Sequence, residues 1–111
     1  MTTLSVSVRD RDDAGTVNGE SVTVAVTGEL DIATVPRFTA HMGEVIGRGQ
    51  FRELVIDLSG LAFIDAGGLR ALADVRRRVE QRDASLVLDG VPRQMQRLMQ
   101  IISPTGQFRL R

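Results

Sequence analysis

The stretch that decides the fold is ELVIDLSGLAFIDAGGLRAL, residues 53 to 72. Residues 53–64 are mostly apolar, and Glu53 and Asp57 are the only charged residues among them. We therefore expect one strand covered on both faces at the centre of a sheet. From Leu69 onward the apolar residues take the spacing of a helix. Between strand and helix lies Asp65-Ala66-Gly67-Gly68. A glycine-rich turn of this kind can cradle an anion, admit another backbone at close range or simply turn the chain.

The residues before this stretch predict two further strands. Residues 4–8 (LSVSV) and 22–26 (VTVAV) alternate apolar and polar side chains, as half-buried strands do. Asn18-Gly19 between them is a good tight-turn pair. We therefore expect the two strands to be antiparallel neighbours.

A helix is predicted to follow, with Thr34 as its cap and Pro36 in its first turn, where proline is tolerated. GRGQ at residues 47–50 ends it. Its apolar stripe consists of Val35, Phe38, Met42 and Val45.

The residues after the central stretch predict three more elements. The helix that begins near Leu69 ends in the turn EQRDAS, and a strand (SLVLDG, 85–90), a helix (PRQMQRLMQIIS, 92–103) and a last strand (FRLR, 108–111) follow. Helices between strands imply right-handed parallel crossovers. The sequence therefore predicts a single small α/β domain over residues 1–111, with a mixed, mostly parallel β-sheet. The buried stripes of the last two helices are Leu69, Leu72, Val75 and Val79, then Met95, Leu98, Met99 and Ile102.

Composition excludes several classes of function. The 111 residues carry no net charge, no cysteine and one histidine, His41, which we expect to be partly exposed on a helix. No nucleophile, base and orienting group can be assembled from these residues, so we expect no enzyme, no cofactor and no metal site. No apolar run approaches the ~20 residues of a membrane span, and the start has no export pattern, so a cytoplasmic protein is expected.

All fourteen basic residues are arginine, and five of them, Arg70, Arg76, Arg77, Arg78 and Arg82, lie on the second helix or just after it. Acidic residues are interspersed among them. The chain has no tryptophan or tyrosine to stack on bases. The arginines therefore indicate a solvated, salt-bridged face, and we expect no direct contact with nucleic acid.

Three aspartates lie within or directly after predicted strands, in GELD (28–31), DLSGL (57–61) and IDAGG (64–68). Loops at the carboxyl ends of parallel strands converge on one edge of the sheet, so Asp31, Asp57 and Asp65 are expected to be neighbours. Three carboxylates can hold a divalent ion, but Asp65 directly before a helix is better explained as an N-cap. Asp57 is expected to bond to local backbone.

Three segments carry a family resemblance: VTVAVTGELDIATVPRF (22–38), ELVIDLSGLAFIDAGGLRAL (53–72) and SLVLDGVPRQMQRLMQIISPTGQF (85–108). They resemble the STAS domain of bacterial anti-sigma factor antagonists. In that family the residues after the second aspartate are typically Ser-Ser-Gly-Leu, and a kinase that is also the anti-sigma factor phosphorylates the second serine. The resemblance implies that the unphosphorylated antagonist binds this kinase-like anti-sigma factor and frees a sigma factor.

This sequence departs from the family at the functional position. Ala66-Gly67-Gly68-Leu69 stands for Ser-Ser-Gly-Leu, so the residue equivalent to the phosphoacceptor is Gly67, which has no hydroxyl. Ser59 matches a serine of the family that is not the acceptor. The resemblance therefore implies a docking surface that is permanently in the unphosphorylated form. The family also commonly continues into a further helix beyond the position of Arg111.

The expected partner-binding surface consists of Asp31, Ser59, Asp65, Ala66, Gly67, Gly68 and Arg70. One alternative is a sensor in which the Gly-Gly helix start holds a nucleotide or another small anion. Another is a structural subunit of a larger STAS assembly. The sequence leaves the oligomeric state open.

Overall fold

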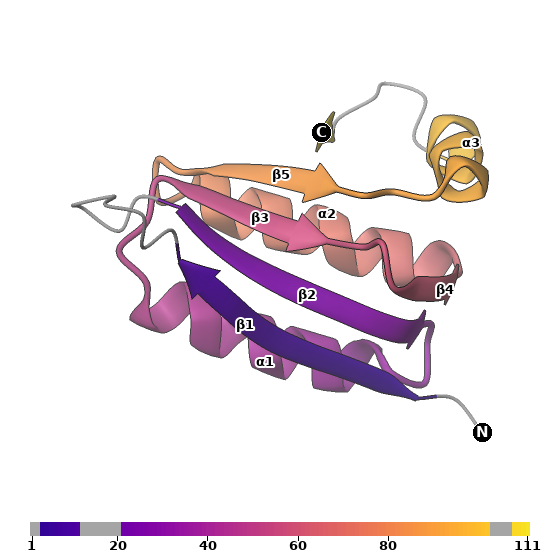
Figure 1. Cartoon of the computed structure of the whole chain (residues 1–111), viewed down its shortest axis with the longest axis horizontal. Coiled ribbons are helices and arrows are strands. Elements are labelled where there is room, and N and C mark those ends of the chain that lie inside the picture. The colour runs from indigo at the N-terminus through magenta and orange to yellow at the C-terminus, as the bar shows by residue number, and fades with distance from the viewer. Residues whose placement is uncertain (1–2, 12–20, 103–107) are drawn as a thin grey trace.

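The computed structural model describes residues 3–11, 21–102 and 108–111. These residues form a mixed sheet with three helices (Figure 1). The elements in chain order are β1 (Leu4–Arg11), β2 (Ser21–Leu30), α1 (Val35–Arg48), β3 (Glu53–Asp57), β4 (Leu61–Ile64), α2 (Ala66–Glu80), β5 (Ser85–Asp89), α3 (Arg93–Ile102) and β6 (Arg109–Leu110).

The sheet has the strand order β1-β2-β3-β5-β6, and β4 pairs with β2 beyond the end of β3. β1 is antiparallel to β2, and every other pairing is parallel. Helices α1 and α2 cover one face of the sheet, whereas α3 lies past the end of β5 (Figure 1). The predicted α/β class, the antiparallel first pair and the mostly parallel sheet are confirmed. The Asn18-Gly19 turn lies outside the described residues.

The apolar stretch at residues 53–64 is two strands, so the prediction of one central strand was wrong. Asp57 interrupts it, because its Oδ1 accepts the N–H of Ser59 at 2.9 Å. The N–H of Leu61 then donates to the carbonyl oxygen of Leu58 at 3.0 Å and closes a turn. After this turn β4 continues along β2, so that the chain reaches the start of α2 at the end of the sheet.

The core lies between the sheet and the two covering helices. The second helix buries its predicted stripe of Leu69, Leu72, Val75 and Val79. In the first helix Phe38 and Met42 are buried as predicted, but Ile46 is the third buried residue, while Val35 and Val45 are only partly covered. His41 is exposed on α1.

Two arginines of α2 lie close to acidic side chains, and Arg82, just after the helix, bonds to backbone carbonyls. Arg77 pairs with Asp74, and Arg76 Nε lies 3.9 Å from a carboxylate oxygen of Glu80. Arg82 donates to the carbonyl oxygens of Ile46 and Gly49. Those carbonyls belong to the last turn of α1 and to its C-cap, where a cation is favourable.

None of the helices within the described ranges is long and apolar enough to span a lipid bilayer.

Candidate functional site

The candidate site lies where the C-terminal end of β2 meets the N-terminal ends of α1 and α2. Asp31, the first residue after β2, is almost fully buried. Its Oδ1 accepts the N–H groups of Ala33 at 3.0 Å and Thr34 at 3.1 Å. The carboxylate therefore holds the turn that leads into α1.

Thr34 occupies the predicted N-cap position of α1, but its side chain does not cap the helix. Its hydroxyl is buried, donates to the carbonyl oxygen of Glu29 at 2.9 Å and accepts the N–H of Asp31 at 3.0 Å. It makes no side-chain bond to the first turn of α1. The turn already begins at Asp31, whose own carbonyl oxygen accepts the N–H of Val35, so the hydroxyl of Thr34 fastens the turn to β2 instead.

Asp65 caps α2, as predicted. Its Oδ1 accepts the N–H of Gly68 at 2.8 Å, which satisfies one of the free donors of the first helical turn. Its Oδ2 accepts the N–H of Ile32 at 3.3 Å. Through these two bonds one carboxylate fixes the start of α2 against the loop before α1.

The two glycines of the turn have different surroundings. A Cβ atom on Gly68 would lie 2.4 Å from the carbonyl oxygen of Leu30 and 2.7 Å from the side chain of Ile64. A Cβ on Gly67 would lie 3.3 Å from Asp65 Oδ1 and 3.9 Å from Ile32. Gly68 thus allows α2 to pack directly on the end of β2, whereas a side chain on Gly67 requires the carboxylate of Asp65 to shift by a few tenths of an ångström. Of the uses proposed for a glycine-rich turn, close backbone approach is the one that Gly68 serves.

The exposed part of the site is small and largely apolar. Ala66 and Arg70 are exposed, and Gly67 is partly exposed. Ile32, beside Gly67, is 79% exposed, and sequence reasoning missed it. Its exposure could have been predicted from its place in the chain. Ile32 is a single large apolar residue in a turn, and it does not belong to the row of apolar residues that the following helix buries. We call Ile32, Ala66, Gly67 and Arg70 the α2 face.

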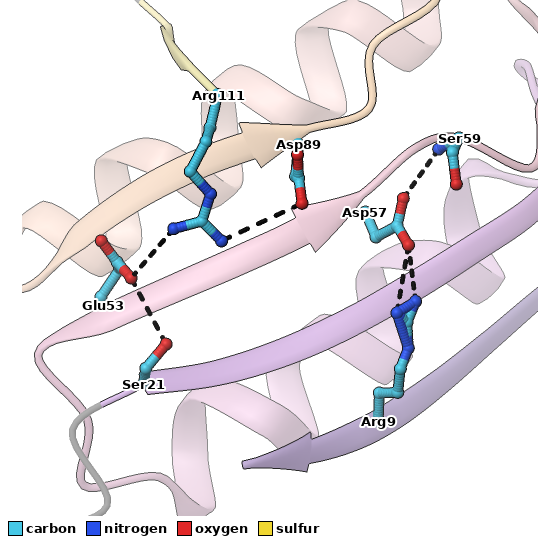
Figure 2. A network of polar contacts seen from close by, with 7 residues as sticks. All are labelled: Arg9, Ser21, Glu53, Asp57, Ser59, Asp89 and Arg111. Carbon is cyan, nitrogen blue, oxygen red and sulfur yellow. Dashed lines mark hydrogen bonds and ion pairs between the residues drawn. The ribbon is translucent and has the colours of Figure 1, made fainter. Parts of the chain in front are cut away.

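Ser59 and Asp57 lie away from the α2 face. Ser59 is in the turn before β4, so all of β4 separates it from Asp65. It lies instead beside Gly90, where an added Cβ atom would be 2.9 Å from the Cβ atom of Ser59. Oδ2 of Asp57 accepts hydrogen bonds from the two terminal guanidinium nitrogens of Arg9, at 3.1 Å and 2.5 Å, across β2 (Figure 2). The expectation that all three aspartates are neighbours was therefore wrong for Asp57.

Asp57 belongs instead to a polar network on the sheet face that α1 and α2 leave uncovered (Figure 2). A second group of contacts lies beside it, in which Arg111 is 3.9 Å from Glu53 and 4.0 Å from Asp89 (Figure 2). The N–H of Ser59 is the largest cause that lowers the pKa of Asp57, and Arg9 lowers it further, although partial burial acts in the opposite direction. As predicted, Asp57 bonds to local backbone.

Replacing Asp57 with asparagine is expected to lower the free energy of unfolding by about 1 kcal/mol at neutral pH, the net value of such contacts. Because the folded-state pKa of Asp57 is lowered, its contribution is complete above the ordinary pKa of about 4 and is lost as pH falls through the folded-state value. The difference between Asp57→Asn and the parent should therefore shrink in acid. Urea unfolding across the acid range measures it, and a difference that stays constant there would contradict the assignment.

The carboxylates of the site are bonded to the protein backbone. Asp31 and Asp65 each use their oxygens on backbone N–H groups of helix starts. No group of three or more His, Cys, Asp or Glu that could hold an ion occurs among the residues that the structure describes. These two aspartates therefore shape the site and leave its exposed part to the α2 face.

Comparison with known proteins gives similarities of both sequence and structure. A family model described as "Mlab, STAS domain" matches residues 16–106. An anti-sigma-B factor antagonist of Listeria monocytogenes is 28% identical over 98 residues, which cover 88% of this chain and 80% of that relative.

Two solved structures share the fold. An anti-sigma factor antagonist from Mycobacterium paratuberculosis has a TM-score of 0.80 at 24% identity, covering 97% of this chain and 85% of that one. The Bacillus cell fate determinant SpoIIAA, in its phosphorylated form, has a TM-score of 0.67 at 18% identity, covering 96% of this chain and 91% of that one. These likenesses confirm the expected fold.

Proposed function

The chain belongs to the STAS domain family, and from this premise we propose that residues 1–111 form one cytoplasmic module that binds a kinase-like anti-sigma factor and thereby frees a sigma factor. Like the anti-sigma factor antagonists that it resembles, the module is a non-catalytic regulator. We further propose that Gly67 occupies the position of the phosphorylated serine, so the module binds its partner without the usual phosphorylation switch.

The observation that carries the proposal is the absence of a hydroxyl at the start of α2. Ala66, Gly67 and Gly68 form the first turn, and none of them can accept a phosphoryl group. The nearby hydroxyl of Thr34 is buried and already bonded to the backbone. Ser59 is exposed but lies at the other end of β4.

The proposed docking surface is the α2 face. Its small residues allow a partner's backbone to approach closely, Ile32 offers an apolar side chain that is 79% exposed, and Arg70 offers a charge. Asp31, Asp65 and Gly68 support this surface from below by fixing the two helix starts. Ser59 would contribute only to a partner that also covers β4.

The alternative of an anion sensor at the Gly-Gly helix start has less support. An anion bound at a helix start accepts N–H bonds from the first turn. Here the carboxylate of Asp65 already accepts the N–H of Gly68 at 2.8 Å. A bound phosphate would have to compete with this carboxylate and its charge.

Incubation with the anti-sigma kinase and ATP is expected to add no phosphate to the parent chain and one phosphate to Gly67→Ser. The new side chain can be accommodated, because the atoms nearest to a Cβ on Gly67 are Asp65 Oδ1 at 3.3 Å, a side-chain atom that needs only a small shift, and Ile32 at 3.9 Å. The kinase is first recovered by capture on the tagged chain and identified by mass spectrometry. Intact-mass measurement then counts the phosphates.

Gly67→Ala is the matched control, since it adds the Cβ without the hydroxyl and should remain unmodified. A stoichiometric phosphate on the parent chain, at Ser59 for example, would show that a switch is still present. A Gly67→Ser chain that binds the kinase but stays unmodified would show that residue 67 is not the acceptor position.

A further inference from the structure

Strand β1 forms an open edge of the sheet. The strand order begins with β1, and its partner β2 lies on one side only (Figure 1). No strand lies along its outer side within the part of the chain that the structure describes. The opposite edge is β6, which has only 2 residues, so β1 with 8 residues is the long edge.

The backbone groups that β1 turns outward can be assigned. The N–H of Glu29 donates to the carbonyl oxygen of Thr3, so Thr3 is a residue that bonds to β2. Bonding alternates along an antiparallel strand, so Leu4, Val6 and Val8 turn their groups away from β2. Arg37 accordingly donates to the carbonyl oxygen of Leu4 from the outer side, at 3.1 Å. The backbone N–H and carbonyl groups of Val6 and Val8 therefore point outward from the sheet edge.

An apolar groove of about 330 Å³ runs along the same edge, between β1 and α1. Its apolar lining comes from Val6, Val8, Val22 and Val45, and His41, Glu44 and Arg48 of α1 also line it. Val8 is 56% exposed, although its register partner on β2, Val24, is fully buried. An open strand edge with exposed apolar side chains is a template for pairing with another strand.

We propose that this edge is a self-association surface, on which β1 of a second copy of the chain pairs antiparallel with β1 about a two-fold axis near Ser7. In this register Val6 of one copy lies opposite Val8 of the other. The outward backbone groups of both residues are then paired, and their side chains fill the two grooves. A two-fold interface suits this edge, because it uses the same surface on both copies.

The charges on the groove support a second copy as the occupant. Glu44 and Arg48 are four residues apart on α1, and both are exposed. The two-fold axis places the two α1 helices side by side and antiparallel, since each covers the same face of its own sheet. Each Glu44 then faces Arg48 of the other copy, so the groove is complementary to itself in charge.

Sedimentation equilibrium of the full chain tests the proposal over about 1–300 µM, a range suited to a small interface. The parent should dimerise, and Val8→Lys should weaken the dimer at least about tenfold, because lysine on a strand edge opposes pairing. Val8 is 56% exposed, so this variant should keep the parent's thermal stability. Ile101→Lys, on α3 and 76% exposed, is the matched control and should dimerise like the parent.

Charge exchange tests the two-fold arrangement. Glu44→Arg and Arg48→Glu should each weaken the dimer, and the double variant should restore it. A parent that is monomeric throughout the range would overturn the proposal, as would a dimer indifferent to Val8→Lys. A double variant as weak as the single ones would overturn the proposed register. These outcomes do not depend on the anti-sigma partner or on Gly67.

Discussion

Gly68→Ala is expected to destabilise the fold by about 3 kcal/mol, at the upper end of the usual cost of overpacking a core. The added Cβ would lie 2.4 Å from the carbonyl oxygen of Leu30. This oxygen belongs to the backbone and cannot rotate away, and it also accepts the N–H of Asp65 at 3.3 Å. The start of α2 would have to move off the end of β2, which would loosen the packing of Ile64 and Leu69. Urea unfolding followed by circular dichroism measures the loss.

Gly67→Ala is the control, because it adds the same methyl group one residue earlier. The atoms nearest to its Cβ would be the side-chain oxygen of Asp65 at 3.3 Å, which needs only a small shift, and Ile32 at 3.9 Å. Alanine also favours a helix over glycine by up to about 1 kcal/mol. The variant should be as stable as the parent or slightly more stable. Equal losses from the two substitutions would show that the tight approach of Gly68 to Leu30 does not limit packing here.

The sequence was sufficient to predict the layered fold, because the pattern of apolar residues follows from which faces are buried. Leu54, Val55 and Ile56 are fully buried in a central strand, and the stripe on α2 lies where its spacing requires. The division into β3 and β4 could not be predicted from this pattern. It depends on a bond from the Asp57 side chain to the backbone, which leaves the run of apolar residues nearly unchanged.

The candidate site was predictable where its contacts are local. The capping bond of Asp65 spans three residues, and the order of residue types specifies it. The positions of Ser59 and Ile32 depend on how β4 and the loop before α1 pack, so the sequence placed Ser59 in a surface that it does not adjoin and gave no sign of the exposure of Ile32. Which of two adjacent glycines can accommodate a side chain depends on the distance from α2 to β2.

Because a side chain on Gly67 needs only a small shift of Asp65, charge at the α2 face is testable without disturbing the fold. A carboxylate at residue 67 would lie in the first turn of α2, where the helix dipole favours it by about 0.3–1 kcal/mol. The carboxylate of Asp65 is close to this position and opposes it. These two effects are of similar size and opposite sign. We therefore expect Gly67→Asp to leave the free energy of unfolding within about 1 kcal/mol of the parent.

Binding to the anti-sigma factor, by contrast, should fall steeply in Gly67→Asp. A partner that covers Ala66, Gly67 and Ile32 removes water from the new carboxylate and leaves it unpaired, which costs about 2–5 kcal/mol, or at least about thirtyfold in Kd. Gly67→Asn is the matched control, because it has nearly the same shape without the charge and should lose far less affinity. Calorimetric titration of the recovered partner into each variant gives the three values. Equal affinities for parent and Gly67→Asp would mean that the partner binds elsewhere, and the assignment of the docking surface to the start of α2 would then be wrong.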